Sequence, residues 1–146
     1  PITDVELSKI DTFNPDEDIK KAIGNNFTLI EFRNTKYKKS LGMKESRALS
    51  EEQMEANLKT NLNSLYADVQ SKKSDYEAAK LSLETADIND NIANVKLQNK
   101  MISGVEYQGE RLKNLQSRQA FETARMEILK SMEVYEAAVA GMAKVE

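Results

Sequence analysis

Between Ser50 and Asn99 the sequence contains no glycine and no proline. These two residues are the ones that most often end or kink a helix. A stretch of about 50 residues without them favours one continuous helix, ~75 Å long at 1.5 Å per residue. The whole chain of 146 residues holds only 5 glycines and 2 prolines, and 31% of its residues are charged. This composition argues against a turn-rich β fold and predicts an all-α protein.

Apolar residues in this stretch recur in alternating steps of four and three, which is the spacing of a coiled-coil seam. The series is Leu58, Leu62, Leu65, Val69, Tyr76, Ala79, Leu83 and Ala86, with Lys72 filling one step. A second series is spaced by sevens and is offset around the helix, and it consists of Leu81, Ile88, Val95 and Ile102. Two offset series predict packing against more than one neighbour. The polar segments "DINDN" (87–91) and "LQN" (97–99) are expected to weaken the seam near its distal end.

The segment "NKMISGVEYQGERL" interrupts this helical pattern. Ser103 is followed three residues later by Glu106, a capping box that predicts the start of a new helix. Ile102 and Tyr107 stand at the positions of a hydrophobic staple, and Asn99 tolerates the left-handed conformation that ends a helix. The segment is therefore predicted to be the tip of an antiparallel helical hairpin.

The return helix is expected over residues 104–143. Its apolar residues are Leu112, Leu115, Phe121, Ile128, Met132, Tyr135, Val139 and Met142. The last five of them again alternate in steps of four and three, as in a coiled coil.

The N-terminal part predicts an extended lead-in over residues 1–13 and then shorter helices. A helix over 14–23 is expected from Asn14 as N-cap and Pro15 in the first turn, with Gly24 as a left-handed stop. A second helix is expected over 27–41, ended by Gly42.

The long helix is expected over 50–99, because Ser50 and Gln53 have capping-box spacing. The predicted fold is thus all-α, a single domain of residues 14–146. It consists of a long antiparallel coiled-coil hairpin with one or two shorter N-terminal helices.

The chain has no cysteine and no histidine, which excludes thiolate nucleophiles, imidazole metal ligands and histidine acid–base chemistry. No phosphate-binding loop, dinucleotide fingerprint, nucleophile elbow or calcium loop is present. We therefore expect no enzyme activity, with no catalytic residues, no cofactor and no metal. The net charge of −3 argues against nucleic acid as the main partner, and no apolar run reaches the ~18 residues of a membrane span.

The order of these elements resembles the α-hairpin repeat of TolC-like outer-membrane efflux proteins. The segments "YADVQSKKSDYEAAKLSLETA", "NKMISGVEYQGERLKNLQSRQAFETARMEILKSMEVYEAAVAG" and "DIKKAIGNNFTLIEFRNTKYKKS" carry the likeness, which covers about residues 14–143. The family's Gly-apolar-apolar-Ser/Thr tip, with its acidic and aromatic residues, is matched by Met101, Ile102, Ser103, Glu106 and Tyr107. Tyr135 and Gly141 match the end of the family's return helix.

The chain also departs from the family pattern. It holds one repeat where the family has two, and its junction "KKSLGMKESRALSEE" is too short for the family's two membrane-spanning strands. We expect either a relative that lacks the β-barrel segment or a trimmed piece. Lys100 stands in place of the family's tip glycine, and Asn99 is expected to take over its conformational role.

The resemblance implies a structural component of an export conduit in the cell envelope, at the periplasmic side of the outer membrane. The chain would form a homo-oligomer, a trimer or hexamer, and work with an inner-membrane transporter. Its tip would dock a periplasmic adaptor (membrane fusion) protein through Lys100, Met101, Ile102, Ser103, Gly104 and Glu106.

The residues alone leave three alternatives open. The tip is also explained as an ordinary inter-helix turn, and the hairpin as a coiled-coil scaffold unrelated to transport. The basic patch at 33–47 (Arg33, Lys36, Lys38, Lys39, Lys44 and Arg47) is either a solvated face or a contact with an anionic membrane surface.

Overall fold

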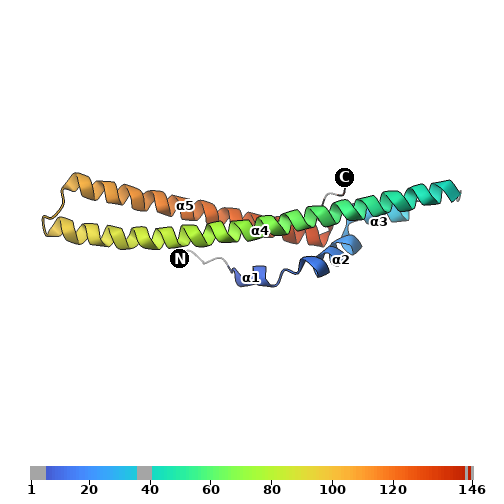
Figure 1. The fold of residues 1–146 in the computed structure, drawn as a ribbon, viewed down its shortest axis with the longest axis horizontal. Helices are drawn as coiled ribbons and strands as arrows, with labels where there is room; N and C mark the ends of the chain where they lie inside the picture. Colours follow the sequence, from blue (N-terminus) through green and yellow to red (C-terminus); the bar gives the residue numbers. More distant parts are fainter. Residues whose placement is uncertain (1–5, 36–40, 144, 146) are drawn as a thin grey trace. The chain divides into compact units, whose positions relative to one another are not determined.

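The computed structural model describes residues 6–35, 41–143 and 145. Within them the chain forms five α-helices followed by one π-helix, and no β-strand (Figure 1). The predicted all-α fold is confirmed. The chain packs as two compact units: unit 1 consists of residues up to Gln70 together with Lys130 onward, and unit 2 runs from Ser71 to Leu129.

The first helix, α1 (Ser8–Asp11), is a single turn that belongs to unit 1. The predicted extended lead-in over residues 1–13 is therefore wrong at these four residues. Ile10 is 1% exposed, so burial of its side chain holds the turn. Most of the stability of such short helices comes from tertiary packing, which the local sequence does not reveal.

The second helix, α2 (Pro15–Asn25), begins where the sequence predicts. The side-chain oxygen of Asn14 accepts hydrogen bonds from the backbone N–H groups of Asp16 at 3.2 Å and Glu17 at 3.4 Å. These bonds satisfy donors that have no partner inside the helix, so the Asn14 cap fixes the start of α2.

The predicted stop at Gly24 is wrong, because Gly24 does not take a positive φ and lies inside α2. Asn26 has an extended backbone (φ −64°, ψ 120°) and separates α2 from α3 (Phe27–Asn34). Its side-chain oxygen accepts from the backbone N–H of Leu29 at 3.1 Å. One asparagine thus ends the first helix and caps the second.

Helix α3 also ends earlier than the predicted 27–41, since Thr35 adopts an extended backbone (ψ 126°). Residues 36–40 lie outside the described part of the chain. Helix α4 (Leu41–Gln98) then runs for 58 residues, so the predicted start at Ser50 is wrong and Gly42 lies within the helix. The Ser50 hydroxyl donates to the carbonyl oxygen of Ser46 at 3.0 Å, the bond that a serine makes inside a helix rather than at its start.

The return helix is shorter than the predicted 104–143. Helix α5 (Gly104–Ala137) gives way to the π-helix η1 (Ala138–Met142), in which Gly141 has φ 115°. A Cβ on Gly141 would lie 2.2 Å from the backbone oxygen of Asn25. The regular helix therefore ends where it meets the end of α2.

Unit 1 has a core of apolar side chains from α1, α2, α3, the first part of α4 and the end of α5. Its fully buried α4 residues Leu58, Leu62 and Val69 belong to the predicted heptad series, so that part of the seam is confirmed. On α5 the predicted Met132 and Tyr135 are buried, and Ser131 is buried beside them and donates to Asp68 at 2.7 Å. In η1 the buried residue is Ala138, whereas the predicted Val139 is half-buried and Met142 is exposed. The buried residues of unit 1 are Ile10, Asp18, Ile19, Ala22, Asn26, Leu29, Leu58, Leu62, Val69, Ser131, Met132, Tyr135, Ala138, Gly141 and Val145.

Unit 2 is an antiparallel hairpin made by the later part of α4 and the earlier part of α5 (Figure 1). Its end farthest from the tip holds an ion pair between Lys72 and Glu127 at 2.9 Å. Next along the seam, the rings of Tyr76 and Phe121 pack with centroids 5.4 Å apart. Residues later in α4 contact residues earlier in α5, so the two helices run antiparallel. The predicted hairpin is therefore confirmed within this unit.

Candidate functional site

The turn between α4 and α5 is built by two interlocking sets of backbone bonds. The N–H of Met101 donates to the carbonyl of Lys96 at 2.8 Å, and the N–H of Lys100 to that of Leu97 at 3.0 Å. This pair of bonds is the Schellman motif, which requires a left-handed residue just after the helix. That residue is Lys100, with φ 56°, and not Asn99 as predicted. Lys100 thus takes the left-handed conformation that the sequence predicts for Asn99.

The start of α5 has the predicted capping box. The N–H of Ser103 donates to the Glu106 carboxylate at 2.7 Å, and the N–H of Glu106 donates to the Ser103 hydroxyl at 3.1 Å. Both bonds to Ser103 favour the ionised carboxylate and lower the pKa of Glu106 below its ordinary value. The two motifs together fix the tip backbone over Lys100–Glu106. Ile102 and Tyr107, the two residues of the predicted staple, are both half-buried, and the staple itself stays a prediction.

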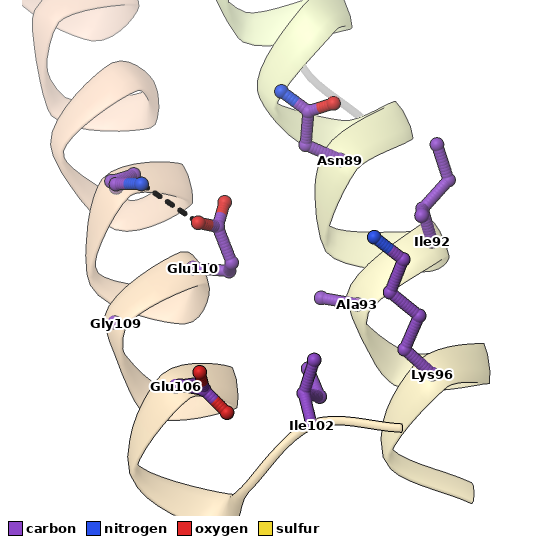
Figure 2. A pocket seen from close by; sticks show the side chains of 9 residues that line it. Asn89, Ile92, Ala93, Lys96, Ile102, Glu106, Gly109 and Glu110 are labelled. Carbon is purple, nitrogen blue, oxygen red and sulfur yellow. Dashed lines mark hydrogen bonds and ion pairs between the residues drawn. The ribbon is translucent and has the colours of Figure 1, made fainter. Parts of the chain in front are cut away.

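Behind the tip the two helices enclose a hollow of about 640 Å³ (Figure 2). Its apolar lining comes from Ile92, Ala93 and Ile102, and Gly109 leaves open space on the α5 side. The remaining lining residues are Asn89, Lys96, Glu106, Glu110 and Lys113. Ala93 carries only a small side chain and Gly109 carries none, and they leave this part of the space between the helices open.

The seam next to this hollow is polar, as the segment "DINDN" predicts. Asp87 accepts a hydrogen bond from the Asn114 amide at 2.6 Å and one from Arg118 at 3.3 Å. Asp90 accepts from Arg111 at 2.9 Å, while its other carboxylate oxygen is buried with no hydrogen-bond partner. A buried acceptor without a partner is unfavourable, so this layer contributes less to hairpin stability than an apolar layer would.

Apolar side chains on the outer faces of the hairpin have no partner within the described chain. On α4 they are Leu81, Ile88 and Val95, three of the four residues of the predicted second series; the fourth, Ile102, is half-buried in the turn. On α5 a matching series, spaced by multiples of seven, consists of Val105, Leu112 and Met126. Each of these six residues is between 55% and 82% exposed. We call the first set the α4 stripe and the second the α5 stripe. The α5 stripe was not predicted, because Gln119 interrupts its repeat.

Two residues of each stripe lie at matching levels along the hairpin. The contacts of Asp87 with Asn114 and of Asp90 with Arg111 fix the pairing of the two helices. Ile88 therefore lies within about one residue, or ~1.5 Å, of the level of Leu112. The same pairing brings Val95 to the level of Val105. These two levels of the distal hairpin thus carry an apolar residue on both outer faces.

The described part of the predicted basic patch is largely engaged within unit 1. Arg33 forms ion pairs with Glu51 and, at 2.7 Å, with Glu55. Arg47 lies over the ring of Phe32, 4.1 Å from its centroid, and donates to the backbone oxygen of the same residue. Lys36, Lys38 and Lys39 lie outside the described residues. The arginines of the patch thus serve to hold α3 on α4.

Within the described ranges, none of the helices combines the length and apolarity needed to cross a membrane. Nor do these ranges contain a group of three or more His, Cys, Asp or Glu residues that could hold a metal ion. No family model, curated protein or solved structure matches the chain. The resemblance to TolC-like proteins stays a prediction.

Proposed function

We propose that this chain is a wall component of a TolC-like export conduit in the cell envelope, in which hairpins of several copies stand side by side. The observation that carries the proposal is the pair of exposed stripes on opposite faces of one hairpin. An isolated hairpin needs only one apolar seam. Two further stripes at heptad spacing are what a helix needs when it also packs against a neighbour.

The second copy is the partner that fits these stripes. If adjacent copies point their tips the same way, α4 of one copy lies against α5 of the next. Ile88 then meets Leu112, and Val95 meets Val105, because the paired residues lie at the same level. Such an interface joins two different faces, and it closes into a ring when the rotation between copies divides a full turn. A trimer or a hexamer satisfies this condition.

Full burial of a large apolar side chain stabilises by roughly 1.5–3 kcal/mol. The stripe residues are already partly covered, so each contributes less than this range. The two level-matched pairs, Ile88 with Leu112 and Val95 with Val105, are proposed to make a specific contact when the copies are held in register.

The tip is proposed to dock a periplasmic adaptor protein. Met101 is 70% exposed beside Lys100, and the two helix-end motifs hold this backbone in one conformation. An apolar residue on a fixed backbone at the end of a hairpin is suited to insertion into a partner, since the backbone loses little conformational entropy on binding. An inner-membrane transporter would complete the export system. We also propose that the lysines of the 33–47 patch contact an anionic membrane surface.

The experiment that tests the side-by-side contact places a charge on one stripe. Ile88→Glu buries a carboxylate against the neighbour's Leu112, and it is expected to raise the concentration at which the oligomer dissociates by about tenfold or more. The matched control is Asn91→Glu, which adds the same charge on the same helix at an exposed position outside both stripes. The absolute mass of each variant is measured by light scattering on a sizing column over a range of concentrations.

Equal dissociation of the two variants would contradict the proposed contact. A chain that is monomeric at every concentration would favour the other interpretation, a coiled-coil scaffold whose stripes receive a helix of a different protein.

A further inference from the structure

The two faces of the unit 2 hairpin that lie between the stripes differ in side-chain size. One face carries mainly short side chains, and we call it the small face. Its residues are Ser71, Asp75, Ala78, Ser82, Thr85 and Asn89 on α4, and Gly109, Gln116, Ala120 and Thr123 on α5. The opposite, long face carries mainly extended side chains, together with the shorter Asp87. By the seven-residue repeat its residues are Lys73, Glu77, Lys80, Glu84 and Asp87 on α4, and Arg111, Leu115, Arg118, Glu122 and Arg125 on α5.

The structure places the members of each face together. A second hollow, of about 480 Å³, opens on the small face beside Asp75, Gln116 and Ala120. The hollow near the tip adjoins Asn89 and Gly109 of the same face. Hollows on one side of the seam show that the short side chains there leave the space between the helices unfilled.

Side chains on the small face also stay close to the backbone. The hydroxyls of Thr85 and Thr123 each donate to a backbone oxygen four residues earlier, at 3.0 Å. Longer side chains also lie on this side: Lys96, Glu106 and Lys113 border the hollow near the tip, and Glu127 borders the second hollow. The Lys113 ammonium is held against Glu110 at 2.7 Å. The face therefore projects little beyond the helix backbones where its short side chains stand, between these two ends.

The long face carries arginines that reach across the seam. Arg118 contacts Asp87, and Arg111 contacts Asp90, so guanidinium groups bridge the two helices on this side. Arg125 is held by Glu122 at 3.2 Å. The arginines recur every seven residues, and their long side chains add volume on this face between Arg111 and Arg125.

A row of helices that packs through its sides curves toward the face with the smaller side chains, because helices approach more closely where less volume separates them. We propose that the small face is the concave, lumen-facing surface of the assembled hairpins and that the long face is the outer surface. This inference rests on the proposed side-by-side assembly. It gives the lumen a lining of hydroxyl, amide and carboxylate groups, with ammonium groups of Lys96 and Lys113 near the tip, which is suited to hydrated cargo.

The chain contains no cysteine, so single cysteines can be introduced without background. Ser82→Cys and Gln116→Cys report on the small face, and Glu84→Cys and Gln108→Cys report on the opposite side. All four positions are exposed in the single chain. Each variant is first sized by light scattering and then labelled as the intact oligomer, with a small maleimide and with a maleimide carried on a long polymer.

The expected result is that the small maleimide labels all four variants at similar rates. The polymer-linked reagent is expected to label the two small-face variants on the order of tenfold more slowly than the two variants of the opposite side. An intact oligomer with the reverse order, or with equal rates at all four positions, would overturn the orientation and leave the assembly standing. A monomer at every concentration would overturn both.

Discussion

The phenol of Tyr135 on α5 donates a hydrogen bond to the carboxylate of Asp18 on α2 across 2.8 Å. Both residues are buried, and the same Asp18 oxygen also accepts from the backbone N–H of Asn14 at 3.1 Å. The ring of Tyr135 lies between those of Phe13 and Tyr66, with centroids 4.5 Å and 6.0 Å away. This bond joins the start of the chain to the return helix within unit 1.

Replacing Tyr135 by Phe keeps the ring and removes the donor to Asp18. We expect a loss of about 1–3 kcal/mol in the free energy of unfolding, because a buried carboxylate oxygen is left with one partner fewer. Urea denaturation followed by circular dichroism measures the change. The matched variant Tyr66→Phe removes a hydroxyl from the neighbouring ring, and a loss equal to that of Tyr135→Phe would contradict the assigned role of the bond.

Alkaline pH should weaken unit 1 through the same residue. Burial, together with the Asp18 carboxylate, raises the pKa of Tyr135 above its ordinary value. The folded state then holds the phenol proton more tightly than the unfolded state does. The resulting stability is present in full below the ordinary tyrosine pKa of about 10, and it is lost as the pH rises from there toward the folded-state pKa. Unfolding free energies measured across this range should fall less steeply for Tyr135→Phe than for the unchanged chain. Parallel curves would rule the linkage out.

Gly141 and Gly109 should respond to alanine in opposite directions. At Gly141 the new methyl group meets the backbone of Asn25 and the backbone keeps a positive φ, so we expect a loss of more than about 2 kcal/mol. At Gly109, inside α5 and beside open space, alanine favours the helix by about 0.5–1 kcal/mol. Denaturation midpoints of the two variants provide the comparison. A tolerated Gly141→Ala would show that η1 does not pack against α2 as described.

The left-handed residue of the tip offers a gain in stability. Lys100→Gly should raise the unfolding free energy by about 1 kcal/mol, since glycine adopts positive φ without the clash that other residues meet. Asn99→Gly is the matched control and should bring no gain, because Lys100 and not Asn99 holds the positive φ. Thermal unfolding of both variants tests this prediction, and a larger gain at position 99 would contradict the Schellman assignment.

Local signals predicted the parts of the fold that local bonds determine. The Asn14 cap and the Ser103–Glu106 box lie within single turns, so the sequence reveals them directly. The heptad series of α4 was also correct in unit 1, because burial along one seam imposes a period on the sequence. These signals placed the hairpin tip within a few residues.

Predictions failed where distant contacts decide the structure. Gly24 stays helical because Asn26 both ends α2 and caps α3, while Gly141 takes the positive φ because α2 lies against it. Ser131 joins Met132 in the buried seam because its hydroxyl bonds to Asp68, a partner 63 residues away in the sequence. Short-range patterns carry no information on such pairings.

Absolute mass in solution tests the central proposal most directly. The unchanged chain is measured by light scattering on a sizing column over a wide range of concentrations. The proposed conduit predicts a discrete trimer or hexamer that dissociates when Ile88 is replaced by Glu. A strict monomer at the highest concentration reached would contradict side-by-side assembly of this chain.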